Sequence, residues 1–220
     1  TSTNSSIGLI YALKKILNID LIINKRKQSN VTKMKELIIH IGYPRTATKT
    51  LQFYLFKKHK DINYLGRFPN REISHHKLIN KVLSFSDEEF DNKFDELVNE
   101  TKALPIDVSK TNLISDEFFL LNDFLYNRMT IEKSIERISK LCKSSEIDLR
   151  ILFSIRSQAE ILKSIFSVTF LTSLKTNSTN LINSIDGMKT DNYREHFLNS
   201  LNYLNLYNKI SQFINKEKIH

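Results

Sequence analysis

The sequence has a single cysteine, Cys142, among its 220 residues. One thiol excludes an internal disulfide and a cluster of thiolate metal ligands, and it does not support a secreted domain held together by disulfides. Long hydrophobic runs are also lacking. The longest candidate, residues 7–23, is interrupted by Lys14, Lys15 and Asp20, so we expect no transmembrane helix. The start of the chain has no basic residue ahead of an apolar stretch and does not resemble a secretory signal, and we expect a cytoplasmic protein.

Positive charge dominates the sequence: 33 lysines and arginines stand against 24 aspartates and glutamates, giving a net charge of +9. This balance favours anionic partners, which include nucleotide phosphates, acidic glycans, nucleic acid and anionic membrane surfaces. The basic residues are scattered, and no motif combines aromatic and basic residues as nucleic-acid-binding modules do, so nucleic acid is not an expected partner. The hydrophobic content of 40% is typical of a globular protein with one sizeable core.

The chain divides near residue 35. Within residues 1–35, apolar side chains recur at helical spacing between residues 7 and 23, and a polar linker follows. This accessory helix either packs on the main domain, the favoured interpretation, or lies on an anionic membrane surface. Residues 36–220 are expected to form the main domain.

Short apolar runs alternate with helical patterns in the main domain. Strands are predicted over residues 37–41, 113–115 and 149–155. Helices are predicted to begin near Leu51, at the capping box Ser86-Asp87-Glu88-Glu89, at Thr130 and at Gln158. The first of these helices is expected to bury Leu51, Tyr54 and Leu55. Strands alternating with helices predict a three-layer α/β/α fold around a central parallel sheet, whose ligands bind beyond the carboxyl ends of the strands. Residues 172–190 are expected to form a loop or lid.

Residues 42–51, Gly-Tyr-Pro-Arg-Thr-Ala-Thr-Lys-Thr-Leu, connect the first predicted strand to a helix. The backbone N–H groups at the start of a helix can bind an anion. Arg45 and Lys49 place positive charge at the positive end of the helix dipole, which costs about 0.3–1 kcal/mol per charge unless an anion binds there. The segment is therefore predicted to be an anion-binding loop.

This loop resembles the segment of sulfotransferases that binds the 5′-phosphosulfate of 3′-phosphoadenosine 5′-phosphosulfate (PAPS), commonly Gly-x-Pro-Lys-(Ser/Thr)-Gly-Thr-Thr-x-Leu. Three positions differ, because Arg45 replaces the usual lysine, Ala47 the glycine and Lys49 the second threonine. The resemblance implies that Arg45 stabilises the leaving phosphate. It also implies a set of donor-binding residues: Arg45, Thr46, Ala47, Thr48, Lys49 and Thr50. A Walker-type loop fits less well, because Tyr43 and Thr48 would occupy its two glycine positions.

A second segment carries the same resemblance. Arg156 follows the strand predicted over residues 149–155, and Ser164 lies eight residues further on, in the next predicted helix. In sulfotransferases an arginine and a serine at this spacing bind the donor's 3′-phosphate, and a planar guanidinium suits phosphate oxygens. Residues 192–197 and the helix to Ile214 resemble a later family segment that leads into another strand and a donor-binding loop. The resemblance covers about residues 36 to 220, and the chain is expected to stop before that strand, as a sulfotransferase truncated at its C-terminus would.

The acceptor must lose a proton, so a general base is expected at the carboxyl end of a strand. Glu117 closes Leu-Ile-Ser-Asp-Glu, which resembles the Ser-Glu segment of glycan-type and bacterial sulfotransferases, where a carboxylate is the base. An exposed acid at a helix start is the alternative interpretation. His75 and His76 are further candidates for the base, although surface histidines are the simpler interpretation. His40 lies inside the first strand pattern and is predicted to be a core residue with its hydrogen bonds satisfied.

The resemblance implies an enzyme that moves a sulfuryl group from PAPS to an acceptor hydroxyl or amine and releases adenosine 3′,5′-bisphosphate (PAP). A carbohydrate acceptor is favoured, because the loop and the Ser-Asp-Glu segment look closer to glycan-type enzymes. The scheme needs no metal, and the sequence has no ligand cluster with metal spacing. Two alternatives stay open: a P-loop-type nucleotide-binding kinase or NTPase, and a non-catalytic sulfotransferase-like fragment.

Overall fold

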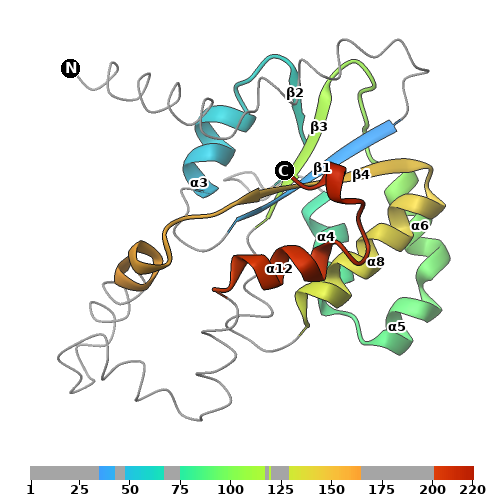
Figure 1. Cartoon of the computed structure of the whole chain (residues 1–220). Coiled ribbons are helices and arrows are strands. Elements are labelled where there is room, and N and C mark those ends of the chain that lie inside the picture. The colour runs from blue at the N-terminus through green and yellow to red at the C-terminus, as the bar shows by residue number, and fades with distance from the viewer. Residues whose placement is uncertain (1–34, 43–47, 67–74, 117–118, 120–128, 165–200) are drawn as a thin grey trace, which may run out of the picture.

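The computed structural model describes residues 35–42, 48–66, 75–116, 119, 129–164 and 201–220. A four-stranded parallel sheet lies at its centre (Figure 1). The strands are β1 (Lys35–Gly42), β2 (Ile62–Tyr64), β3 (Thr111–Ser115) and β4 (Ile147–Ser154). Their order across the sheet is β2-β3-β1-β4, so β1 lies between β3 and β4. The α/β class and the parallel sheet predicted from the sequence are confirmed.

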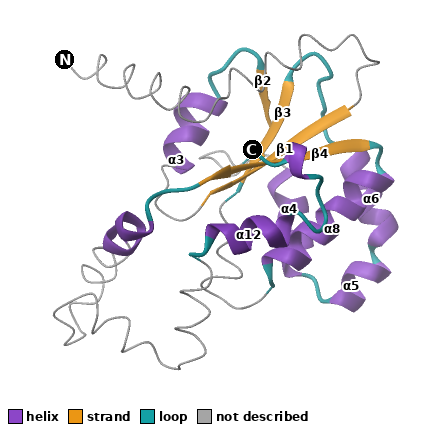
Figure 2. Ribbon diagram, in the orientation of Figure 1, coloured by secondary structure: helices purple, strands orange, loops and turns teal. Residues whose placement is uncertain are grey.

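Helices lie between successive strands along the chain and also follow β4 (Figure 2). Their bounds are α3 (Thr48–Thr50), the π-helix η1 (Leu51–Phe56), α4 (His75–Ser84), α5 (Asp87–Asn92), α6 (Phe94–Lys102), α8 (Ile131–Ser144), α12 (Tyr203–Ile210) and the 3-10 helix η2 (Lys216–Lys218). Residues 158–164 are also helical. The described helices therefore include one at each of the four predicted starting points.

The side chains of β1 alternate between two cores because successive residues of a strand point to opposite faces of the sheet. Leu37, Ile39 and Ile41 belong to a large core that includes buried side chains of α4, α6, α8 and α12. Ile38 belongs to a smaller core with Leu51, Leu55 and Phe56, among others. Helices therefore cover both faces of the sheet, which explains why β1 reads as a continuous apolar run.

Side chains at the helix starts satisfy backbone N–H groups that the helices leave free. Ser86 and Glu89 form the predicted capping box: the Ser86 hydroxyl accepts from the Glu89 N–H at 3.1 Å, and Glu89 Oε2 accepts from the Ser86 N–H at 2.8 Å. Thr130 caps α8 by accepting from the Lys133 N–H at 3.3 Å.

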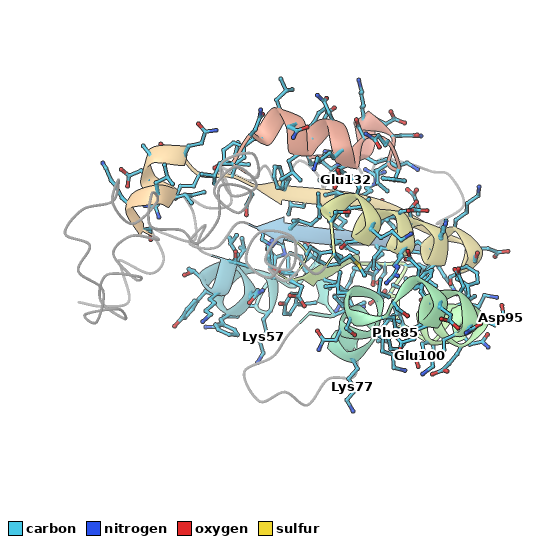
Figure 3. All side chains as sticks on the ribbon, turned by 90° about the horizontal axis from the view of Figure 1, so that it is seen from below. Lys57, Lys77, Phe85, Asp95, Glu100 and Glu132 are labelled. Carbon is cyan, nitrogen blue, oxygen red and sulfur yellow. The ribbon has the colours of Figure 1, made fainter. Side chains whose placement is uncertain are left out.

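An ion pair joins two helices on the large-core side of the sheet. Glu132 of α8 pairs with Lys209 of α12 at 2.8 Å, and Figure 3 shows Glu132 between these two helices.

The helix that follows the candidate anion loop buries a different face from the one predicted. Leu51 and Leu55 are buried as expected, but Tyr54 is 50% exposed and Lys58 lies over its ring, 5.1 Å from the centroid. Gln52 and Phe56 are buried in its place. The buried stripe thus follows residues i, i+1, i+4 and i+5, and the prediction for Tyr54 was wrong because another apolar residue, Phe56, lies on the side facing the sheet.

Three further features differ from the expectations or were missed. Strand β2 and helix α4 were not predicted. The expectation that no further strand begins before the end of the chain was also incomplete, because Ile219 forms a parallel bridge with Ile151 of β4. His220 contributes both backbone bonds there: its N–H donates to the Ile151 carbonyl at 2.9 Å, and its carbonyl accepts from the Phe153 N–H at 2.7 Å.

Several expectations concern residues outside those described. They include the accessory helix over residues 7–23, the loop over residues 172–190 and the family-like segment 192–197. None of the helices in the described part of the chain has the length and apolar character that a bilayer crossing requires.

Candidate functional site

The carboxyl ends of three neighbouring strands meet at one edge of the sheet. Gly42, the last residue of β1, lies opposite Ser154, the last residue of β4. On the other side of β1, His40 lies opposite Ser115, the last residue of β3. The candidate anion loop, Arg156 and the Ser-Asp-Glu segment follow these three strands in the sequence, so the strand ends that lead into them lie at the edge where parallel α/β proteins bind ligands.

The anion loop itself is described only in its last part. Arg45, Thr46 and Ala47 lie outside the described residues. Thr48 begins α3, directly before η1, and is 2% exposed, while Lys49 is exposed and Thr50 half-buried. The described residues thus place a strand before the predicted anion loop and a helical segment after it, as an anion site at a helix start requires. A π-helical turn such as η1 is rare and is frequent at functional sites.

Arg156 lies two residues beyond β4, and its side chain is 41% exposed. It pairs with Glu160 at 3.2 Å, and Lys163 pairs with the same carboxylate at 3.1 Å. Lys163, followed by Arg156, lowers the pKa of Glu160. An exposed ion pair of this kind is worth about 0–1 kcal/mol, so Glu160 is a weak competitor for the guanidinium against a phosphate.

Ser164 is the last described residue of the helix that follows Arg156, and it is half-buried. Ile161 anchors this helix in the large core with 0% exposure. The backbone at Arg156 is also held, because its carbonyl accepts a hydrogen bond from the Tyr203 hydroxyl of α12. Both predicted contacts of the 3′-phosphate therefore belong to a segment that packs on the domain.

The proposed general base, Glu117, lies outside the described residues, as do the side chains of His75 and His76 at the start of α4. The residue before Glu117 is described. Asp116 is 4% exposed, and its N–H donates to the His40 carbonyl at 3.2 Å. Burial, and then the charge of Asp116, raise the pKa of Tyr64. Asp116 is thus a second carboxylate at this edge that the sequence analysis passed over, although the same Ser-Asp-Glu segment contains it.

His40 is a core residue with its hydrogen bonds satisfied, as predicted. It is 0% exposed, and its Nδ1 and Nε2 lie 2.7 Å and 3.0 Å from the hydroxyls of Ser115 and Ser154. Burial lowers the pKa of His40 to about 3, so the imidazole is neutral at physiological pH. The side chain joins β1 to the last residues of both neighbouring strands.

Gln52 joins the helix after the anion loop to the same place. Its amide nitrogen donates to the Ser115 carbonyl at 3.2 Å and to the Ser115 hydroxyl at 3.1 Å. Phe56, from the same helix, makes an edge contact with the His40 ring at 5.2 Å between centroids. The sequence analysis did not single out Gln52; the available signal was a polar residue next to Leu51 at the start of an apolar stripe.

A hollow of about 670 Å³ lies at the opposite edge of the sheet, where β1 and β4 begin. Lys35, Lys143, Asp148 and Lys218 are among its lining residues, and Lys218 pairs with Asp148 at 2.5 Å. Ligands of parallel sheets bind at the carboxyl ends of the strands, so we place the candidate site there rather than in this hollow. No three His, Cys, Asp or Glu side chains in the described part of the chain are grouped to hold a metal ion.

No protein-family model matches the chain, and no curated protein sequence is significantly similar to it. The function is therefore inferred from the motifs and from the strand ends that carry them.

Proposed function

We propose that the protein is a sulfotransferase that uses PAPS as the donor and an acceptor hydroxyl or amine, with a carbohydrate as the favoured acceptor. The sulfotransferase form of the α/β fold is part of this proposal. The observation that carries it is the pairing of β1 with β4, which ends with Gly42 opposite Ser154. This register supports one donor site, because the two segments with sulfotransferase-like motifs leave adjacent strand ends.

The proposed site holds the donor at both of its phosphate positions. Residues 45–50 bind the 5′-phosphosulfate through backbone N–H groups, hydroxyls and cations. Arg156 and Ser164 bind the 3′-phosphate through a charge-assisted contact and a hydroxyl hydrogen bond. The 3′-phosphate distinguishes this donor from ATP and AMP, so the second pair of residues supplies the selectivity.

In the reaction, the acceptor oxygen or nitrogen forms a bond to sulfur while the bond from sulfur to the bridging oxygen of the 5′-phosphate breaks. Glu117 takes the acceptor proton, and PAP leaves with the bridging oxygen. Negative charge grows on that oxygen in the transition state, as in phosphoryl transfer, and Arg45 stabilises it there. Asp116, at the same strand end, is the alternative carboxylate for the proton.

The donor site is tested by measuring the affinities of PAP and AMP by calorimetry. The unaltered protein should prefer PAP, and Arg156→Ala should lose most of that preference, a change of about 1.5–3 kcal/mol for a charge-assisted hydrogen bond. Lys163→Ala is the matched control, because it removes the other cation that pairs with Glu160 and should leave the preference intact.

The outcomes separate the competing functions. Equal affinity for PAP and AMP in the unaltered protein would contradict the proposal, and a preference for ATP over PAP would favour a kinase or NTPase. With labelled PAPS and a panel of acceptors, the enzyme should release PAP in step with acceptor sulfation. Binding without any release would identify a non-catalytic protein.

A further inference from the structure

Four buried side chains form a hydrogen-bonded group near the carboxyl ends of β1, β3 and β4. We name Gln52, Ser115, His40 and Ser154 the strand-end network. The members come from η1, β3, β1 and β4, and they are 5%, 0%, 0% and 5% exposed, respectively. These elements lead into or follow the anion loop, the Ser-Asp-Glu segment and Arg156, so one network connects every segment of the proposed site.

We assign one donor-to-acceptor direction to the hydrogen bonds of the network, from Gln52 through Ser115 and His40 to Ser154. The Gln52 amide nitrogen also bonds the Ser115 carbonyl, which can only accept, so this nitrogen donates to the Ser115 hydroxyl as well. The Ser115 hydroxyl keeps its own hydrogen to donate, and we assign this hydrogen to His40 Nδ1, 2.7 Å away. A neutral imidazole that accepts at Nδ1 carries its proton on Nε2, which donates to Ser154 at 3.0 Å.

Burial makes this arrangement rigid. A buried polar group that loses its partner costs about 1–3 kcal/mol, so each member keeps the others in place. Phe56 contacts the edge of the imidazole, and the Asp116 N–H bonds the His40 carbonyl at 3.2 Å. The ends of β3 and β4 are thus tied to β1 by side chains as well as by the sheet hydrogen bonds.

We propose that His40 is a positioning residue for the sulfuryl-transfer site, setting the spacing of the ends of β3 and β4 through the strand-end network. The inference rests on the proposed function for its consequences. The network has two arms, the hydrogen bond from His40 to Ser115 and the hydrogen bond from His40 to Ser154. The Ser115 arm positions the segment with Glu117, and the Ser154 arm positions Arg156. Small displacements of groups in a reacting complex can lower rates by up to about a hundredfold, so a network outside the reaction can have a measurable effect.

The two arms have different kinetic signatures. Ser154→Ala should weaken PAP binding about five- to tenfold in calorimetry, because Arg156 is displaced. Ser115→Ala should lower kcat for PAP release about five- to tenfold while the PAP dissociation constant changes less than about twofold, because the segment with the base is displaced. His40→Gln keeps an amide donor near the position of Nε2 and should retain more PAP affinity than His40→Leu, which removes both arms.

Ser134→Ala is the matched structural control, because Ser134 is 0% exposed and donates to the Thr130 carbonyl at 3.0 Å on a helix away from the network. If this control changes kcat and PAP affinity as much as the two network variants do, the network has no positioning role. Equal effects of Ser115→Ala and Ser154→Ala on both quantities would likewise overturn the division into two arms.

Two measurements do not depend on activity. Long-range ¹H–¹⁵N spectra should show a neutral His40 with its proton on Nε2, and a proton on Nδ1 would overturn the proposed direction. Amide hydrogen exchange at Asp116 should accelerate in Ser115→Ala and His40→Leu but not in Ser134→Ala. If the unaltered protein fails to bind PAP, the proposed function fails alone, and unchanged exchange at Asp116 in these variants would overturn the network separately.

Discussion

Arg45 is the residue on which the proposed chemistry most depends. The sulfotransferase loops that residues 42–51 resemble commonly carry lysine at this position, and in the proposed mechanism either side chain would supply a cation to the bridging oxygen. Arginine adds a planar fork and cannot be deprotonated in proteins, whereas lysine is a compact point charge. The leaving group is a weakly basic phosphate oxygen, so a fixed positive charge meets its main requirement without a proton.

Replacing Arg45 should affect turnover more than binding. Arg45→Ala is expected to lower kcat by about a hundredfold or more, because it removes a preorganised group that acts in the transition state, while the PAPS dissociation constant rises less. Arg45→Lys should retain much of the activity. Steady-state kinetics and donor binding check this. A lysine variant as inactive as the alanine variant would assign Arg45 to structure or bidentate binding instead.

The burial of His40 should make the folded protein less stable in acid. Its pKa falls from an ordinary 6.5 to about 3 in the folded protein, because burial disfavours the imidazolium. Below pH 6.5 the His40 side chain is protonated in the unfolded chain but stays neutral in the folded protein. The free energy of unfolding therefore decreases as the pH falls toward 3. Between these two pKa values the free energy of unfolding decreases by up to about 1.4 kcal/mol per pH unit.

Urea unfolding between pH 7 and 5 isolates this effect, because most carboxylates titrate at lower pH. His40→Asn should be less stable at pH 7 but should show a flatter dependence of the unfolding free energy on pH. An equally steep dependence in the variant would assign the acid sensitivity to other groups.

At the scale of elements, one buried arginine joins three helices on the large-core side of the sheet. Arg137 of α8 is 2% exposed, and its Nη1 donates to the carbonyls of Val82 and Phe85 at 2.9 Å and 2.7 Å. Its Nη2 pairs with Asp87 of α5 at 2.7 Å, and the guanidinium lies over the Phe90 ring at 4.7 Å. The hydrogen bond from Arg137 is the largest cause that lowers the pKa of Asp87, and the hydrogen bond from Lys133 is the next. Figure 3 labels Phe85, which lies just beyond α4.

Arg137→Met should therefore destabilise the fold by about 2–3 kcal/mol, because two carbonyls lose their donor while most of the buried volume is kept. Lys133→Met is the control: Lys133 pairs with the same Asp87 at 3.1 Å, but both side chains are exposed, and its loss should cost less than about 1 kcal/mol. Urea denaturation measures both changes. Equal effects would mean that burial of the guanidinium has no energetic importance.

At the scale of the whole molecule, the net charge of +9 should act on the encounter with an anionic donor. Such attraction is screened over about 8 Å at physiological ionic strength, but extends to about 30 Å in 0.01 M salt. The association rate constant of PAP should therefore fall when salt is raised over this range, while the dissociation rate constant changes less. Stopped-flow binding measures both constants, with uncharged adenosine as the control. A salt-independent association rate for PAP would show that long-range attraction has no part in binding.

The sequence by itself determined the elements whose signals are local. The apolar run over residues 37–41 followed by Gly42 predicted β1, because a strand covered on both faces has no polar side to display. Ser86 and Glu89 predicted a helix start, because the capping box uses only side chains and backbone within four residues. The motif residues after β1 and β4 could be found for the same reason. Short β2 and weakly apolar α4 carried too little local signal.

Only the tertiary structure decided which of these segments meet. His40 contacts serines 75 and 114 residues away along the chain, and Gln52 contacts one 63 residues away. Such pairs depend on strand order and register, which no local period encodes. The exposure of Tyr54 has the same cause: its helix was recognisable, but packing in the smaller core decided which side of the helix faces the sheet. The sequence could therefore indicate the candidate anchors one by one, whereas the pairing of β1 with both neighbours decides that the strand ends before them lie at one sheet edge.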